Sequence, residues 1–68
     1  MHEVSIATDS IRLGQFLKYA DVVEIGSDVK DLLADGAVLV NGQHEARRGR
    51  TLVRGDVVTV DGIDVRVS

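Results

Sequence analysis

The sequence has no cysteine, no proline and no tryptophan, and it has one phenylalanine and one tyrosine. Without cysteine there is no disulfide, no thiolate metal site and no cysteine nucleophile. No apolar run approaches the roughly 18 residues of a membrane-spanning helix. The N-terminal residues MHEVSIATDS lack the basic start and long apolar stretch of a signal peptide. We therefore expect a cytoplasmic protein that does not associate with membranes.

Basic residues are scarce but clustered. The chain has eleven Asp plus Glu against eight Lys plus Arg, which gives a formal net charge of −3. Four arginines and one glutamate lie between Gln43 and Arg54, so that segment carries +3 and the other residues −6. A basic patch on an acidic body can hold a polyanion, because partners respond to local potential. The alternative is a solvated arginine-rich hairpin that only keeps the protein soluble.

The hydrophobic pattern predicts one small α+β domain over residues 1–68, with two short helices packed on a small, mostly antiparallel sheet. Alternation over Glu3–Ala7 favours a first strand. Asp9 or Ser10 is the candidate cap of a first helix. The buried face of that helix recurs at helical spacing and consists of Leu13, Phe16, Leu17 and Ala20.

A second helix is predicted after an apolar connector, Asp21–Gly26, that we expect to be packed. Ser27 is its candidate N-cap, and Gly36 is placed to end it with a positive φ. Its expected buried face consists of Val29, Leu32 and Leu33.

Tight turns divide the rest of the chain into strands. Val38–Val40 is followed by Asn41-Gly42, the pair that best suits a type I′ hairpin turn. Two further turns and two further strands follow: Gly55-Asp56, Val57–Val60, Asp61-Gly62 and Ile63–Val67. The predicted core consists of Leu13, Phe16, Leu17, Leu32, Leu33, Val38, Val40, Val58 and Val60.

Residues that could carry catalysis are few. The chain has two histidines, His2 at the terminus and His44 beside a turn. No serine stands at a suggestive spacing from either, and the glycines are turn glycines that form no phosphate loop. The acidic residues are spread over turns and helix ends. We expect no enzyme activity, no catalytic residue, no cofactor and no metal site.

Lys30 is the lysine placed least favourably for helix stability. If Ser27 caps the second helix, Lys30 stands at its third position, where a cation opposes the helix dipole. The Ser27 hydroxyl, the Lys30 ammonium and free backbone N–H groups could then bind a phosphate. Alternatively, Asp28 and Asp31 neutralise Lys30, or its stem covers apolar surface.

Arg12 and Lys18 lie on the first predicted helix. Arg12, near its start, also opposes the dipole, whereas Lys18 near its end is favourable. They are six residues apart, so we expect them not to share one narrow stripe.

The order and spacing of these motifs resemble the alpha-L RNA-binding motif, the domain first seen in ribosomal small-subunit protein four (the S4 domain). The matching stretches are IRLGQFLKYADVV, GSDVKDLLADGAVLVNG and RRGRTLVRGDVV, within Ile11–Asp61. In that family a Gly-x-Val-x-Val-Asn-Gly hairpin follows two helices, and here Gly36–Gly42 matches it in full. Gly55-Asp56 matches a later turn. Gly14 stands near a position where many members carry Asp.

The resemblance implies a stand-alone RNA-binding module of the small bacterial type, without the catalytic domains fused to larger members. It implies structured RNA as partner, ribosomal or tRNA, and association with ribosomes or assembly intermediates. We expect a monomer. The expected RNA-binding residues are Arg12, Lys18, Ser27, Lys30, Asn41, Arg47, Arg48 and Arg50, with the last three arginines and Lys30 on one basic face. The alternative is a protein-interaction module that binds an acidic partner through the same arginines.

Overall fold

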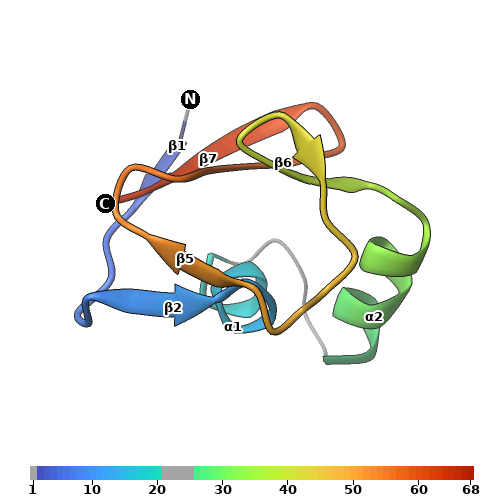
Figure 1. The fold of residues 1–68 in the computed structure, drawn as a ribbon, viewed down its shortest axis with the longest axis horizontal. Helices are drawn as coiled ribbons and strands as arrows, with labels where there is room; N and C mark the ends of the chain where they lie inside the picture. The colour runs from blue at the N-terminus through green and yellow to red at the C-terminus, as the bar shows by residue number, and fades with distance from the viewer. Residues whose placement is uncertain (1, 21–25) are drawn as a thin grey trace.

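The structure is a computed structural model that describes residues 2–20 and 26–68, with side chains in the second helix described from Val29 onward (Figure 1). Its elements are β1 (His2–Val4), β2 (Ser10–Arg12), α1 (Leu13–Tyr19), α2 (Gly26–Ala34), β3 (Val38–Val40), β4 (Gln43–His44), β5 (Thr51–Val53), β6 (Val57–Val60) and β7 (Ile63–Val67). The predicted α+β class is confirmed. The predicted packed connector falls on residues 21–25, outside the described residues.

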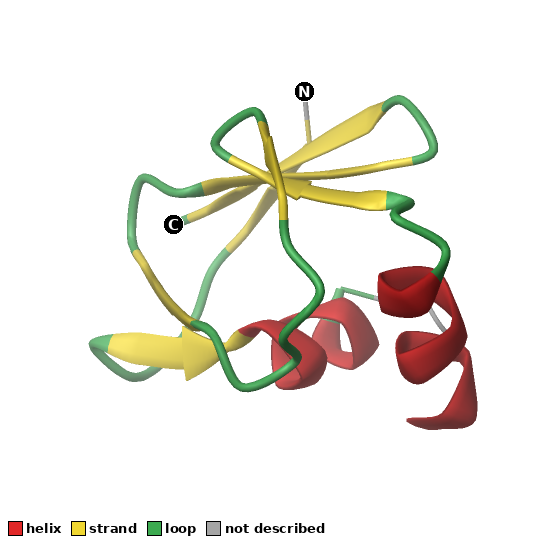
Figure 2. Ribbon diagram, turned by 45° about the vertical axis from the view of Figure 1, so that its right-hand side comes forward, coloured by secondary structure: helices red, strands yellow, loops and turns green. Residues whose placement is uncertain are grey.

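The strands form one five-stranded sheet and one separate pair. The sheet order is β1-β7-β6-β3-β4, and β2 pairs with β5. Every pairing is antiparallel except that of β1 with β7, which is parallel. Figure 2 shows the sheet on one side of the molecule and the two helices on the other, with the strand pair beside α1. The mostly antiparallel sheet is therefore as predicted.

Helix α1 begins later than predicted and has a different cap. It starts at Leu13, and its N-cap is Arg12, whose side chain makes no capping hydrogen bond. Ser10 is in β2 instead, paired with Val53. The first N–H groups of α1 are satisfied from elsewhere, because Leu13 donates to the carbonyl of Arg50 at 2.8 Å and Gly14 to that of Arg48 at 2.9 Å. A cap at Asp9 or Ser10 is therefore wrong.

Helix α2 ends as predicted. Gly36 has a φ of +72°. Its N–H donates to the carbonyl of Leu33, and the N–H of Ala37 donates to that of Leu32. These two bonds form the Schellman arrangement that closes many helices at a glycine. The start differs from the prediction: because α2 begins at Gly26, Ser27 is its second residue rather than its cap.

The core lies between the sheet and the helices. Eight of the nine predicted core residues are buried, and Leu32 is partly buried against them. The buried set also includes residues that the core prediction omitted: Ile6, Val29, Leu52, Val65 and Val67. The first strand, predicted over Glu3–Ala7, is shorter, but Ile6 is still buried and donates its N–H to the carbonyl of Ser68 at 2.8 Å. Ile63, at the start of β7, is 54% exposed.

The Asn41-Gly42 turn has the predicted geometry. Asn41 has a φ of +51° and Gly42 a φ of +83°. Both residues of a type I′ turn need positive φ, so this turn matches the right-handed twist of β3 and β4.

Gly42→Val is expected to destabilise the fold by about 1–3 kcal/mol, because a β-branched residue is strained at positive φ. Apart from its two neighbours in the chain, no residue has an atom within 4 Å of a Cβ built at Gly42, so the cost would be conformational rather than steric. Urea denaturation measures it. The matched control is Gln43→Val, on the exposed neighbouring strand residue, where we expect a change within about 0.5 kcal/mol. Equal unfolding midpoints for the two variants would contradict the turn assignment.

Candidate nucleic-acid interface

The arginine-rich segment forms a turn that is docked on the start of α1. The N–H of Arg50 donates to the carbonyl of Arg47 at 3.2 Å, which closes the turn over residues 47–50. The carbonyls of Arg48 and Arg50 accept the first helix N–H groups, and Arg12 Nη1 donates to the carbonyl of Gly49 at 3.0 Å. Three hydrogen bonds thus fix the turn and the N-terminus of α1 relative to each other, and a fourth closes the turn itself.

Gly14 permits this close approach. It is buried in α1, and a Cβ built there would lie 3.2 Å from Arg48 Cβ and 3.4 Å from the Arg48 carbonyl oxygen. Those distances are tighter than most carbon contacts in proteins, so a larger residue would push the turn away from the helix. Glycine is a poor helix former. The close packing of Arg48 explains why a glycine occupies position 14 of this helix.

Between α1, α2 and the turn lies a groove of about 370 Å³ with a basic lining. Its lining residues are Arg12, Gly14, Gln15, Lys18, Val29, Arg48 and Gly49. Three of these described residues are cations and none is a carboxylate. We call this surface the basic groove. Arg12 and Lys18 both line this groove, although they do not share a narrow stripe of the helix. Arg12 is the N-cap residue of α1 and Lys18 lies in its last turn, and the groove is wide enough to include both.

Lys30 does not join the residues that line the groove. It is exposed on α2, and because the helix begins at Gly26 it is the fifth residue, beyond the first turn. The N–H groups there bond within the helix. The predicted positions, Ser27 as the N-cap and Lys30 as the third helical residue, are therefore wrong, and the Ser27 side chain lies outside the described residues. Whether either residue contacts RNA stays a prediction.

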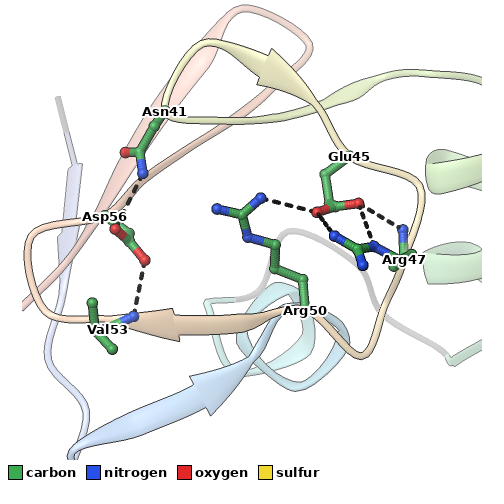
Figure 3. A network of polar contacts seen from close by, with 6 residues as sticks. All are labelled: Asn41, Glu45, Arg47, Arg50, Val53 and Asp56. Atoms are coloured by element: carbon green, nitrogen blue, oxygen red, sulfur yellow. Dashed lines mark hydrogen bonds and ion pairs between the residues drawn. The ribbon is translucent and has the colours of Figure 1, made fainter.

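Arg47 and Arg50 share the carboxylate of Glu45, which is only 8% exposed (Figure 3). Oε2 accepts from Arg47 Nε and from the Arg47 backbone N–H, each at 3.2 Å. Oε1 accepts from Arg47 Nη2 at 3.3 Å and Arg50 Nη1 at 3.0 Å. The Arg47 side chain, then that of Arg50, lowers the pKa of Glu45 to about 2 by hydrogen bonding to its charged form. The three arginines are therefore not equivalent.

The other two arginines of the segment differ again. Arg54 donates to the carbonyl of Ile6 at 3.1 Å and lies 3.6 Å from Asp9. Arg48 is exposed and forms no ion pair with any residue among 2–20 and 26–68 for which side chains are described. Arg48 is thus the arginine of the turn that is most available to an external anion.

Asn41 has a structural role in joining two turns. Its Nδ2 donates to Asp56 Oδ1 at 3.1 Å, and its Oδ1 accepts from the N–H of Val57 at 2.9 Å. Asp56 Oδ2 in turn accepts from the N–H of Val53 at 2.9 Å (Figure 3). Both ends of the amide are occupied within the fold, and an RNA contact by Asn41 stays a prediction.

Among the described residues, no three His, Cys, Asp or Glu side chains gather where they could hold a metal ion. Glu45 is the one buried polar or charged side chain in the described part of the chain, and it is paired. No described helix is long and apolar enough to cross a membrane.

Removing the Glu45 charge is expected to make the stability of the fold depend less on pH in the acid range. Because its pKa is depressed in the folded state, Glu45 stabilises the fold above its ordinary pKa of 4.5, and that contribution is lost as pH falls toward about 2. Thermal melts of the wild type and Glu45→Gln should differ most at neutral pH and converge in acid. Glu3→Gln, at an exposed ion pair of 3.9 Å, is the control and should follow the wild type. A constant difference between wild type and Glu45→Gln across that window would contradict the assignment.

The comparisons with known proteins agree with the fold. The S4 domain family model matches residues 4–68. The probable ribosome maturation protein RlbA of Bacillus subtilis (strain 168) is 51% identical over 59 residues, which cover 87% of this chain and 83% of that protein. The fold also resembles the crystal structure of the 30S ribosomal protein S4e from Thermoplasma acidophilum, with a TM-score of 0.74 and 22% identity, over 87% of this chain and 31% of that one. Since the family model spans nearly the whole chain and the Bacillus protein is more than half identical, this chain belongs to the S4 domain family.

Proposed function

We propose that this domain binds structured RNA through the basic groove and catalyses no reaction. The main support for the proposal is that Arg12, Lys18 and Arg48 all line one groove, on a chain whose net charge is −3. Phosphate contacts from Lys and Arg supply most of the affinity of nucleic-acid binding. Three cations in one groove of an acidic chain are suited to a partner that carries several negative charges along its length, such as the phosphates of a nucleic acid.

Recognition in this proposal rests on phosphates and shape. Phe16 is fully buried, which leaves Tyr19, 60% exposed at the end of α1, as the aromatic side chain available for stacking. Single-stranded RNA is usually held by several stacked bases, whereas double-stranded or folded RNA is held by backbone and shape contacts. The groove therefore favours structured RNA.

Ribosomal RNA is the class that we favour, with tRNA as the other candidate. The support is the name of the Bacillus relative, a probable ribosome maturation protein. We propose that the domain acts in the cytoplasm as a monomer on ribosomes or on their assembly intermediates.

A salt titration tests the proposal. The dissociation constant for a fluorescein-labelled ribosomal RNA hairpin is measured over a range of salt concentrations. With three groove cations, the logarithm of the association constant should fall with the logarithm of the salt concentration with a slope of about −2 or steeper, since each phosphate contact contributes roughly 0.7–0.9. An unstructured poly(U) oligonucleotide should bind more weakly at every salt concentration. Binding that is absent at low salt, or indifferent to salt, would overturn the proposal.

An acidic protein partner is the second candidate, and the Glu45 network favours it. Arg47 and Arg50 already hold one carboxylate, so their geometry is compatible with carboxylates from outside the chain. A pull-down with and without ribonuclease separates the two. Partners retained after nuclease treatment support protein binding, and partners lost with the RNA support the RNA proposal.

A further inference from the structure

A second hollow lined by arginines adjoins the basic groove at the arginine turn. It has a volume of about 480 Å³ and is lined by Arg47, Gly49, Arg50 and Thr51. Gly49 is the residue that it shares with the basic groove. The residue that both hollows share therefore has no side chain, while arginines line both hollows.

The fold itself does not require glycine at position 49. Gly49 is not among the residues with positive φ, in contrast to Gly42. The nearest atom to a Cβ built there is Arg12 Nη1 at 3.6 Å, an ordinary van der Waals contact, whereas a Cβ at Gly14 would meet Arg48 Cβ at 3.2 Å. Glycine also destabilises a fold through the entropy of the unfolded chain. Neither backbone conformation nor packing accounts for a glycine that is exposed and unfavourable for stability.

We propose that Gly49 is a point of close approach for the RNA sugar-phosphate backbone, which crosses the turn there and places successive phosphates in the two hollows. The inference rests on the proposed RNA-binding function. Glycine is the residue used where a ligand must come close to the main chain. Here it would let one phosphate meet Arg12, Lys18 and Arg48. It would let a neighbouring phosphate meet Arg47 and Arg50, whose two positive charges exceed the single negative charge of the Glu45 carboxylate that they share. The side chain missing from position 49 is then a feature of the binding surface.

Gly49→Ala and Gly49→Gln test this inference through two readouts of opposite sign. Gly49→Ala is expected to raise the melting temperature by about 2–6 °C, because alanine restricts the unfolded chain. The same variant should weaken binding of the labelled ribosomal RNA hairpin at least threefold, and Gly49→Gln at least tenfold. The slope of log K against log salt should become shallower in both, because fewer phosphates reach the arginines.

The control is Ala7→Ser, which adds one heavy atom at an exposed loop position away from the turn and should leave RNA affinity unchanged. Unchanged affinity in Gly49→Ala and Gly49→Gln would overturn the inference. So would a lower melting temperature of Gly49→Ala, since the fold would then require the glycine, and so would an equal loss of affinity in Ala7→Ser. If the wild type binds no RNA, the proposed function fails first, and that result is distinct from normal binding by both Gly49 variants.

Discussion

Phe16→Ala is expected to lower the free energy of unfolding by about 3–5 kcal/mol, the usual range for removing a buried phenylalanine ring. Phe16 is fully buried in α1, flanked by Leu13 and Leu17, which are equally buried. It is the single phenylalanine of a 68-residue chain, so no other side chain of that size and shape supports the core. Small domains have a total stability of about 5–15 kcal/mol. The variant should therefore melt far below the wild type or be unfolded at 25 °C.

Tyr19→Ala is the matched control, because Tyr19 is the other aromatic residue of α1 and is 60% exposed. Its loss should change stability by no more than about 1 kcal/mol. Urea denaturation followed by circular dichroism measures both. If Phe16→Ala and Tyr19→Ala unfold at the same urea concentration, the buried face assigned to α1 is wrong.

Reversing two charges in the basic groove is expected to weaken RNA binding at least tenfold while the fold stays intact. The variant is Lys18→Glu with Arg48→Glu, and a tenfold loss corresponds to about 1.4 kcal/mol. Both side chains are exposed, so their charges contribute little to stability. Arg47 is a poorer choice, because a glutamate there would face the buried carboxylate of Glu45 instead of pairing with it. Fluorescence anisotropy with the labelled RNA hairpin measures the affinity.

Arg66→Glu, compared with Arg48→Glu alone, separates the groove from a general effect of charge. Arg66 lies on β7, is exposed and is 3.9 Å from Glu3. Both single variants change the net charge by the same amount. If Arg66→Glu weakens binding as much as Arg48→Glu does, affinity follows overall charge and the groove is not the site.

The parts of the fold that short-range chemistry determines were predicted from the sequence. The buried face of α1 follows from helical spacing, and the hairpin follows from Asn41-Gly42, whose φ values are those the residue types favour. The end of α2 at Gly36 has the same kind of cause. Each of these signals lies within a few residues of the structure it specifies.

The start of α1 and the make-up of the groove depend on residues far apart in the chain. The sequence offered Asp9 and Ser10 as caps, but the carbonyls of Arg48 and Arg50 take that place from more than 30 positions away. No local pattern indicates such a contact. Arg12 and Lys18 line one groove because the arginine turn packs against the start of α1, and spacing along the helix does not predict this.

The role of Glu45 was also hidden in the sequence, where it reads as one acidic residue among arginines. Its burial is set by the packing of the turn, and burial favours pairing with Arg47 and Arg50 over exposure to solvent. The sequence therefore predicted the total charge of the segment, but it did not predict that Arg47 and Arg50 pair with Glu45 while Arg48 stays exposed.

Chemical-shift mapping of the isotope-labelled domain with the ribosomal RNA hairpin tests the central claim most directly. The account predicts that the backbone amides of Arg12–Lys18 and Arg47–Thr51 shift on titration, with the largest changes around Arg48 and Gly49. The amides of β1 and β7, which carry Glu3 and Asp64, should stay in place. Shifts centred on β1 and β7, with none in α1 or the arginine turn, would contradict the claim that the basic groove is the RNA-binding site.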